Sequence, residues 1–465
     1  MNAGSPVILG VLGHYGNRNL GDEASISSLL DGLRRLEPEA VFRGYSLDPA
    51  DTAARYAIPA YPIRRSGRSA AVLAPSDVSS ARLCRVPAGF SVNRVGAESA
   101  AIPGWRRGLK RIPGLIPLGR LARGSVAAMV AVTGEIRFIR RSLPALRNLD
   151  LLLIAGSNQF EDKFGGLWGF PYTLLKWALM ARLQGVRVCF VSVGARALNH
   201  AGSGWAIRCA VALADFVSFR DERSRVLVRK GRVGGAVYPD LAHALSLGNY
   251  CRGHAAAAIG RRACTVAINL MPVHDPRYWP VPDARRYAAY VACMSSLVNR
   301  LAAGGYRIVF FAMQPADDRV IEDVRRTLSY RGDGKLTVPL DALIATELSE
   351  LLALLLNVDA VVATRFHGVL LSLVVRRPVL ALCYEHKTMD LMNAFGLGGY
   401  ATQLGKESPA RLHRNLERLL ADEHVPQLLR TNSQLHRMAL ERQFDLILSK
   451  ARECRARRTA QDAVA

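Results

Sequence analysis

The sequence has no long hydrophobic run. Its longest apolar stretches, at residues 351–356 and 369–375, are far shorter than the roughly 20 residues that a membrane-spanning helix needs. The first seven residues carry no basic region, and the apolar stretch at residues 7–12 is too short for a signal peptide. We therefore expect a cytoplasmic protein whose apolar runs form buried core elements.

Closely spaced cysteines and aromatic residues are also scarce. The eight cysteines include no C-x-x-C pair, and Cys189 and Cys383 lie in apolar, strand-like runs. This pattern favours reduced, buried thiols and gives no support to a structural zinc site, so we expect no bound metal. Aromatic residues make up 7% of the chain and hydrophobic residues 50%, which is typical of a globular enzyme.

Acidic residues are outnumbered, and the imbalance is local. The chain carries 62 Lys and Arg against 38 Asp and Glu, a formal charge of +24. Between residues 60 and 147 there are 16 basic residues against only Asp77, Glu98 and Glu135. Such a field favours anionic partners, namely phosphorylated substrates, anionic lipid headgroups or nucleic acid. Because Arg and Ala are frequent throughout the chain, a GC-biased genome is an alternative explanation.

The length of 465 residues fits two domains, and the pattern alternates between strands and helices. The alternation predicts an α/β fold with two Rossmann-like domains facing a cleft, a GT-B-like plan. We place the N-terminal, acceptor-side domain at residues 1–250, the C-terminal, donor-side domain at 251–430, and a helical tail at 431–465. Regular periodicity is weak at residues 60–147, which we interpret as a partly mobile basic insertion with one or two amphipathic helices. Residues 104–123 mix apolar and basic side chains, which suits either an interfacial segment or a basic solvated linker.

The first candidate site is a loop between the strand at residues 7–13 and the helix at residues 22–36. Glycine and asparagine tolerate left-handed backbone conformations, so such a loop can wrap tightly and direct its N–H groups at a ligand. Its spacing matches neither a P-loop nor G-x-G-x-x-G. Asp22 and Glu23 follow at the start of the helix, where the alternative interpretation is that they are caps. The glycines and asparagines of the loop are Gly13, Gly16, Asn17, Asn19 and Gly21.

The second candidate site is Arg365-Phe366-His367, which lies between a strand and the start of a helix. Open α/β sheets bind ligands at such positions. The Arg365 guanidinium offers a bidentate fork for phosphate or carboxylate, and His367 can transfer a proton near neutral pH. An isolated histidine is more often structural, but the Arg-x-His spacing at this position favours function.

Two further positions offer positive charge to the same place. Arg220 follows a short strand, and Asp221 after it is expected to cap the next helix or to pair with an arginine. Lys387 follows the strand after the Arg-x-His helix. A surface salt bridge for Arg220 and a solvated side chain for Lys387 are the alternatives.

Taken together, these segments resemble the polysaccharide pyruvyl transferases. Residues 13–23 are similar to the G-x-x-G-N-x-x-L-G-D-E signature of that family, and residues 220–224 to its R-D-x-x-S element. Pro239-Asp240 and the block at residues 359–387 resemble the P-D and D-x-x-x-x-x-R-x-H…P…Y…K patterns that follow. Residues 156–159 read Gly-Ser-Asn-Gln, where the family often has three glycines, and the segment at 60–147 is longer and more basic than usual. Both departures concern the acceptor side.

The resemblance implies transfer of pyruvate from phosphoenolpyruvate to a pair of sugar hydroxyls as a ketal, in a cell-envelope polysaccharide, an exopolysaccharide or a lipid-linked precursor. It implies that Arg220 and Arg365, with Phe366 and Lys387, hold the donor, that His367 protonates the enol carbon, and that Asp22 accepts hydroxyl protons. Phosphoenolpyruvate is then a co-substrate, and no cofactor is expected. The basic segment at 60–147 would hold the enzyme peripherally at an anionic membrane surface on the inner face of the plasma membrane.

Two other functions fit the same sequence. A glycosyltransferase with a nucleotide-sugar donor shares the two-domain plan, and fold alone does not separate it from a pyruvyl transferase. A non-enzymatic anion-binding scaffold would account for the charge. No nucleic-acid-binding module is recognisable, so we expect no nucleic acid partner.

Overall fold

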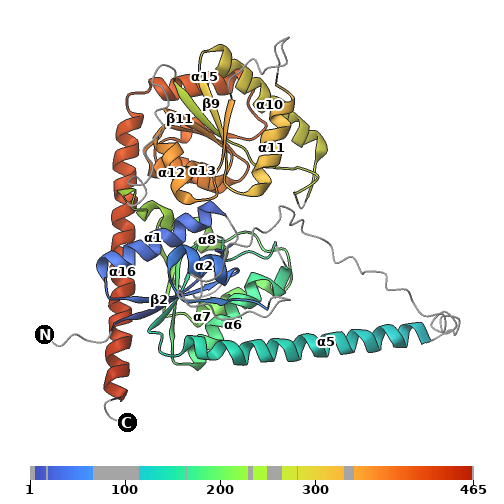
Figure 1. Cartoon of the computed structure of the whole chain (residues 1–465), viewed down its shortest axis with the longest axis vertical. Helices are drawn as coiled ribbons and strands as arrows, with labels where there is room; N and C mark the ends of the chain where they lie inside the picture. The colour runs from blue at the N-terminus through green and yellow to red at the C-terminus, as the bar shows by residue number, and fades with distance from the viewer. Residues whose placement is uncertain are drawn as a thin grey trace.

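The computed structural model describes residues 6–16, 19–65, 115–156, 158–163, 165–228, 234–248, 264–279, 281–328 and 340–462. For residues 115–128, 340–342, 344 and 462 it describes the backbone alone. Within these residues the chain forms two α/β domains stacked end to end (Figure 1). The α/β class predicted from the sequence is therefore confirmed.

A seven-stranded parallel sheet forms the centre of the N-terminal domain, in the order β3-β2-β1-β4-β5-β6-β7. Strands such as β4 are buried along their whole length, as expected for a parallel sheet covered on both faces. In chain order the strands are β1 (Ile8–Leu12), β2 (Val41–Ser46), β3 (Ala60–Pro62), β4 (Leu151–Ala155), β5 (Arg187–Val193), β6 (Phe216–Phe219) and β7 (Ala236–Val237).

Helices cover both faces of this sheet. One face packs against α1 and the last helix of the chain, and the other packs against α6 and α7. The helices of this domain are α1 (Leu20–Leu36), α2 (Pro49–Tyr56), α5 (Leu115–Ser142), α6 (Phe170–Leu183), α7 (Ser203–Ala212) and α8 (Glu222–Val228). Short 3₁₀ turns are η2 (Leu143–Leu146), η3 (Gly166–Trp168) and η4 (Leu241–Ala244).

The C-terminal domain has a six-stranded parallel sheet in the order β10-β9-β8-β11-β12-β13. One hydrophobic core joins this sheet to its helices. The strands are β8 (Thr265–Asn269), β9 (Arg307–Ala312), β10 (Leu340–Ile344), β11 (Ala360–Ala363), β12 (Val379–Cys383) and β13 (Ala401–Gln403). The helices are α10 (Ala284–Ala303), α11 (Pro315–Arg326), α12 (Leu348–Leu356), α13 (Phe366–Val374), α14 (His386–Ala394), η5 (Gly398–Tyr400), α15 (Pro409–Ala421) and α16 (Val425–Asp462).

The last helix, α16, joins the two domains. It runs along both of them (red in Figure 1). Val425 and Leu429 belong to the core of the C-terminal domain, whereas Phe444 and Ile447 belong to the core of the N-terminal domain. At Gly32 of α1 an added Cβ would lie 2.3 Å from the Phe444 ring, so this glycine lets the two helices approach closely. The predicted tail, which starts at residue 431, begins within this longer helix.

The structure corrects the predicted limits of the basic insertion at 60–147. Residues 60–62 form β3, the edge strand of the N-terminal sheet, because they pair in parallel with β2. From residue 115 the backbone forms the 28-residue helix α5. Most of the predicted interfacial segment at 104–123 lies outside the described residues. The edge strands β10 and β13 were also not predicted.

The predicted domain boundary at residue 250 lies between the two sheets, since β7 ends at Val237 and β8 begins at Thr265. In the described part of the chain, neither α5, α16 nor any other helix combines the length and the apolar character needed to cross a membrane.

Candidate functional site

The loop after β1 is held by its own backbone and by Glu23. Gly16 has a φ of +74°, and its N–H donates to the Glu23 carboxylate at 3.0 Å. Asn19 is the N-cap of α1, because its side chain accepts from the Gly21 N–H at 3.1 Å. The expectation that Asp22 or Glu23 is the cap is therefore wrong: the helix begins at Leu20, which places both carboxylates in its first turn.

The predicted loop residues have different surroundings. Gly13 donates its N–H to the carbonyl of Tyr45 and packs against the carbonyl of Ala155, so it fixes the turn. Gly21 instead faces the C-terminal domain, where an added Cβ would lie 2.1 Å from Nδ1 of His367. Asn17 lies outside the described residues.

Asp22 pairs with His14. The His14 Nδ1 lies 3.4 Å from Oδ2 of Asp22, and both side chains are mostly buried. Burial lowers the pKa of His14, but the hydrogen bond to Asp22 and the charge of Asp22 outweigh it, so the pKa is raised. The other side of the imidazole contacts Phe170, with 4.7 Å between ring centroids. Asp22 is thus placed beside a group that stabilises its negative charge.

Arg220 lies at the end of β6 and reaches the domain interface. Its Nη2 donates to Asn158 Oδ1 at 2.7 Å, and its Nη1 lies 3.4 Å from Oδ2 of Asp240. Its Cζ lies 4.9 Å from the ring centroid of Phe366 in the opposite domain. Asp221 caps α8 through the Ser224 N–H and also pairs with Arg220, so both expected roles are confirmed.

Asp240 connects three elements that meet between the domains. It caps η4, and its Oδ1 accepts from Ser25 of α1 at 3.1 Å. Its Oδ2 faces Arg220 and lies 4.0 Å from Nε2 of His367. Burial alone would raise the pKa of Asp240, but His367 and Arg220 lower it below its usual value. This carboxylate therefore remains negative and faces both Arg220 and His367.

The start of α13 places Arg365 and His367 in different directions. The Arg365 side chain forms a bidentate ion pair with the buried Asp317 of α11, with Nε 2.6 Å from Oδ2. Its charge is therefore already compensated within the C-terminal domain. The His367 ring faces the N-terminal domain and lies against Gly21.

His367 is enclosed and largely uncharged in the free protein. Burial lowers its pKa, and the carboxylates of Asp240 and Asp22 oppose this effect only in part. Among the described residues, no group lies within hydrogen-bonding distance of the buried Nε2. A neutral imidazole with an unsatisfied nitrogen can accept a proton or a hydrogen bond from a ligand.

Lys387 reaches the same place from the start of α14. Its Nζ lies 5.1 Å from the centroid of Phe366 and 3.2 Å from Oε2 of Glu385. Burial and the nearby charges of Arg196 and Arg220 lower the pKa of Lys387 to about 7, although Glu385 opposes the shift. Lys387 is therefore poised between its charged and neutral forms near neutral pH.

These contacts bring most of the predicted residues together where the carboxyl ends of the two sheets face each other. Arg220, Phe366, His367 and Lys387 form one cluster, with Asp22 close enough to influence His367 electrostatically. The structure adds residues that the sequence did not single out as site residues. They are Asn158 and Asp240 on the N-terminal side and Asp317 and Glu385 on the C-terminal side. The position of Asp240 after Pro239, at the end of a strand, was the available signal.

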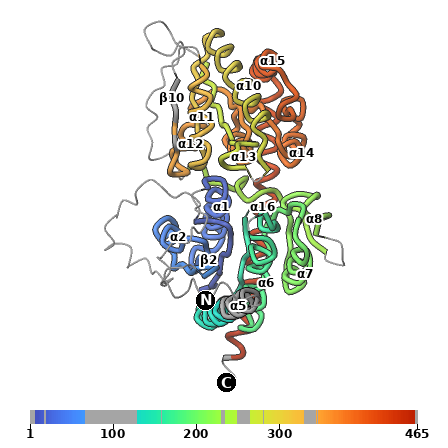
Figure 2. Tube along the Cα trace, turned by 90° about the vertical axis from the view of Figure 1, so that its right-hand side faces the viewer, coloured from blue at the N-terminus to red at the C-terminus, as the bar shows by residue number. Residues whose placement is uncertain are grey.

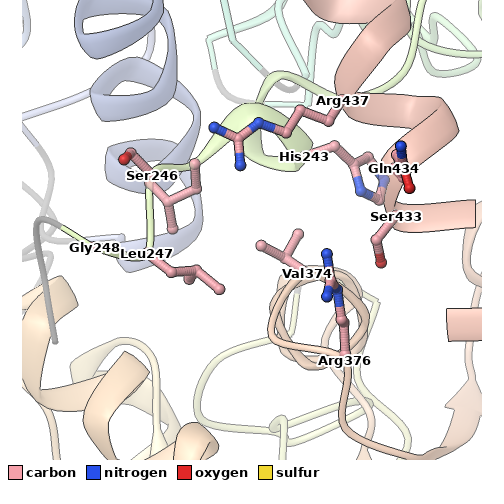
Figure 3. Close-up of a pocket in the computed structure, with 10 residues that line it drawn as sticks. His243, Ser246, Leu247, Gly248, Val374, Arg376, Ser433, Gln434 and Arg437 are labelled. Atoms are coloured by element: carbon pink, nitrogen blue, oxygen red, sulfur yellow. The ribbon is translucent and has the colours of Figure 1, made fainter. Parts of the chain in front are cut away.

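A separate cavity of about 320 Å³ lies behind η4 (Figure 3). It is lined by the segment after η4, the end of α13 and the middle of α16, including His243, Arg376 and Arg437. His243 is stacked on Phe395, and its Nε2 lies 3.3 Å from Nδ1 of His436. None of the predicted site residues lines this cavity, so it is distinct from the cluster around Phe366.

Comparison with known families identifies the chain at family level. The model of the polysaccharide pyruvyl transferase family matches residues 19–386. The chain belongs to this family. The match covers the predicted site residues from Asn19 to His367 and ends one residue before Lys387. It confirms the resemblance drawn from the motifs. No curated protein sequence matches the chain significantly.

Solved structures of other proteins have a fold similar to that of this member of the pyruvyl transferase family. A UDP-GlcNAc 2-epimerase from Neisseria meningitidis, bound to UDP-GlcNAc, is 11% identical, with 96% of this chain and 99% of that chain covered at a TM-score of 0.53. The UDP-GlcNAc 2-epimerase from Methanocaldococcus jannaschii is 10% identical, with 90% and 93% covered at a TM-score of 0.52. At such low identity these similarities establish the GT-B-like fold alone.

Proposed function

We propose that this protein transfers a pyruvyl group from phosphoenolpyruvate to two hydroxyls of one saccharide, forming a ketal and releasing phosphate. The observation that carries the proposal is the cluster of Arg220, Lys387 and His367 around Phe366. Phosphoenolpyruvate carries a phosphate and a carboxylate, and two cations from opposite domains suit such a donor.

The donor's charge falls mainly to Arg220 and Lys387. Arg365 is paired with Asp317, so its first role is to fix the start of α13, with a share in the donor's carboxylate as a secondary role. An anionic donor beside His367 raises the pKa of its imidazole, because negative charge stabilises the protonated ring.

The reaction begins with proton transfer from the imidazolium of His367 to the methylene carbon of the donor. The methylene becomes a methyl group, and the adjacent carbon becomes an oxocarbenium-like centre. A sugar hydroxyl attacks this centre and passes its proton to Asp22. The second hydroxyl then displaces phosphate, which leaves with the oxygen of the former enol bond and takes up the proton that Asp22 received. The proton of the second hydroxyl returns the imidazole to its protonated form.

The acceptor that we propose is a cell-envelope saccharide, either an exopolysaccharide unit or a lipid-linked precursor. We assign Gly21, which lies against His367, and the His14–Asp22 pair to acceptor binding. We place the reaction in the cytoplasm, with the enzyme held peripherally at the inner face of the plasma membrane. No cofactor or metal takes part in this scheme.

Thermal unfolding in the presence of ligands tests the donor. Phosphoenolpyruvate at 100 times its Kd is expected to stabilise the protein by about 2.7 kcal/mol, whereas UDP and GDP should have no effect. Arg220→Gln should lose this stabilisation, and Arg286→Gln, a change at an exposed arginine of α10, should keep it. Stabilisation by UDP and not by phosphoenolpyruvate would favour a glycosyltransferase instead.

Turnover tests the catalytic assignment. Wild-type protein with phosphoenolpyruvate and a lipid-linked saccharide extract should release phosphate and form an acid-labile ketal. His367→Gln should still be stabilised by phosphoenolpyruvate but should lose about 100-fold or more in turnover. Unchanged turnover in His367→Gln would refute the role of His367.

A further inference from the structure

A cationic cavity of about 370 Å³ lies between α5 and α6, outside the cluster around Phe366. Of the described residues that line it, Arg64, Arg65 and Lys176 are basic and Glu135 is acidic. Arg64 and Arg65 follow the edge strand β3, Lys176 lies on α6, and Glu135 lies on α5. The lining therefore has a net charge of +2, which favours an anionic ligand.

Arg64 is held in place but has an unused donor. Its Nε donates to Thr173 Oγ1 at 3.0 Å, and its Cζ lies 4.5 Å from the ring centroid of Phe170. Its Nη2 is buried, and the described residues supply no hydrogen-bond partner for it. An unsatisfied buried guanidinium nitrogen is costly, and a phosphate oxygen would satisfy it.

The other two cations border the same space. Arg65 donates from Nη1 to the carbonyl of Ala131 at 2.8 Å and lies across Gly134 of α5, where a Cβ would clash with its guanidinium. Lys176 is paired with Glu135 at 2.8 Å, and Glu135 also accepts from the Tyr172 hydroxyl at 3.2 Å. Glu135 thus neutralises Lys176 and leaves the two arginines as the anion-binding groups.

Helix α5 and the rim of this cavity carry exposed apolar side chains. Met129, Val132 and Ile136 are spaced i, i+3 and i+7 on α5, so they share one face, and they are 69%, 57% and 52% exposed. Trp168, at the edge of the cavity, is 75% exposed. Helix α5 extends away from the body of the N-terminal domain (Figure 1), and Figure 2 views it along its axis near the end of that domain.

The charge of this region favours a lipid surface over two other ways of covering the apolar face. A second copy of the chain would bring a second set of cations against Arg64 and Arg65, and like charges repel. Residues 66–114 of this chain carry eight Lys and Arg against Asp77 and Glu98, so they are also cationic. An anionic phospholipid layer instead supplies phosphates for the cavity and an apolar interior for α5 and Trp168.

The cavity adjoins the acceptor side of the candidate active site. The Phe170 ring lies 4.5 Å from the Arg64 guanidinium carbon and 4.7 Å from the His14 ring centroid. His14 in turn contacts Asp22. One aromatic ring therefore separates a phosphate at Arg64 from the residues proposed to receive the saccharide.

We propose that the cavity at Arg64 and Arg65 binds the phosphate of an anionic phospholipid, while the Met129–Val132–Ile136 face of α5 and Trp168 enter the headgroup boundary. This docking surface rests on the proposed function, since it would present the acceptor side of the enzyme to saccharides at the membrane. The shared chemistry of phosphate and apolar chain also occurs in polyprenyl phosphates, and the experiment separates the two sources.

Flotation of the full chain with phosphatidylglycerol and phosphatidylcholine vesicles, at about 0.1 and 0.5 M salt, tests the docking. We expect binding to phosphatidylglycerol alone, weakened by salt. Removing one cationic charge should lower the partition coefficient about fivefold, so Arg64→Gln and Arg65→Gln should each do so, and Glu135→Gln should raise it about fivefold. Ile136→Asp should lower the partition coefficient tenfold or more. Brominated lipid should quench the tryptophan fluorescence of Trp168, and this quenched component should be absent in Trp168→Phe.

Matched controls lie elsewhere on the surface. Arg286→Gln removes an exposed charge and Val226→Asp changes an exposed apolar residue of α8, so neither should alter vesicle binding. Equal vesicle affinity of Arg65→Gln and wild type would overturn the proposal, as would binding of farnesyl diphosphate without binding to vesicles. A wild-type dimer that Ile136→Asp converts to a monomer would show that α5 is a dimer interface and would also overturn it. Because no phosphoenolpyruvate is present, failure here is distinguishable from failure of pyruvyl transfer.

Discussion

Replacing Lys387 with arginine is expected to make the alkaline fall of kcat/KM for phosphoenolpyruvate less steep. In the wild type, Lys387 is surrounded by Phe366, Arg196 and Arg220, with Glu385 as its nearest carboxylate. Burial and the two arginines lower its pKa to about 7, so much of its charge is lost just above neutral pH. Arginine has a pKa above 12 and stays charged throughout the range.

The size of the effect follows from the fraction of protonated lysine. With a pKa of 7, about half of the side chains are charged at pH 7, about one in ten at pH 8 and about one in a hundred at pH 9. If the donor binds only beside a charged Lys387, loss of this charge contributes about a tenfold fall in kcat/KM per pH unit above pH 7, in addition to the fall caused by deprotonation of His367. The phosphate of the donor loses its last proton near pH 6, so it adds no slope in this range.

Steady-state phosphate release between pH 6 and 9.5 measures this limb, and kcat/KM reports the free enzyme. Lys387→Arg should lose the part of the fall that Lys387 contributes and keep the part that deprotonation of His367 contributes, with a lower maximum because the guanidinium is larger than the ammonium group. Lys406→Arg, at an exposed position after β13, should keep the wild-type profile. The same alkaline limb in Lys387→Arg and wild type would refute the assignment of Lys387 to donor binding.

Two further predictions concern the domain interface. Gly21→Ala should lower kcat about 100-fold, because its Cβ would lie 2.1 Å from the His367 ring and would displace the imidazole by about 1 Å. The control is Gly399→Ala, since nothing lies within 4 Å of an added Cβ there. An unchanged kcat in Gly21→Ala would contradict the contact. The free energy of unfolding should fall as the pH falls below about 6.5, because burial lowers the pKa of His243 to about 3 and that of His436 to about 4, and the unfolded chain therefore binds more protons in this range. At pH 5 His243 should lower the free energy of unfolding by about 2 kcal/mol relative to neutral pH. Urea unfolding of His243→Gln should lack this part of the pH dependence. The same pH dependence in the variant and the wild type would contradict the prediction.

Much of the fold could be predicted because its signals are local. The predicted strand at residues 7–13 contains β1, and the predicted helix at residues 22–36 ends where α1 ends, since buried parallel strands are continuous apolar runs and amphipathic helices have a clear period. The short edge strands β3 and β13 have no such run. Each becomes a strand only because a neighbouring strand offers it hydrogen bonds.

The candidate site was only partly predictable. Strand ends followed by helix starts identified Arg220, His367 and Lys387, because this position recurs in open α/β sheets. The pairing of Arg365 with Asp317 joins residues 48 positions apart and was not readable from the sequence. The P-D motif drew attention to Asp240, but its contacts with Ser25 and His367 were not expected.

Local sequence therefore settles which segments form the strands, the helices and the glycine-rich loop, since each of these depends on neighbouring residues along the chain. The state of the site depends on distant residues brought together by packing. Burial between the domains leaves His367 neutral and shifts Lys387 toward neutral pH, and Asp317 takes up the charge of Arg365. Desolvation and ion pairing act over a few ångströms in space, so the same arginine or histidine acquires its charge and direction only after both domains and α16 have packed.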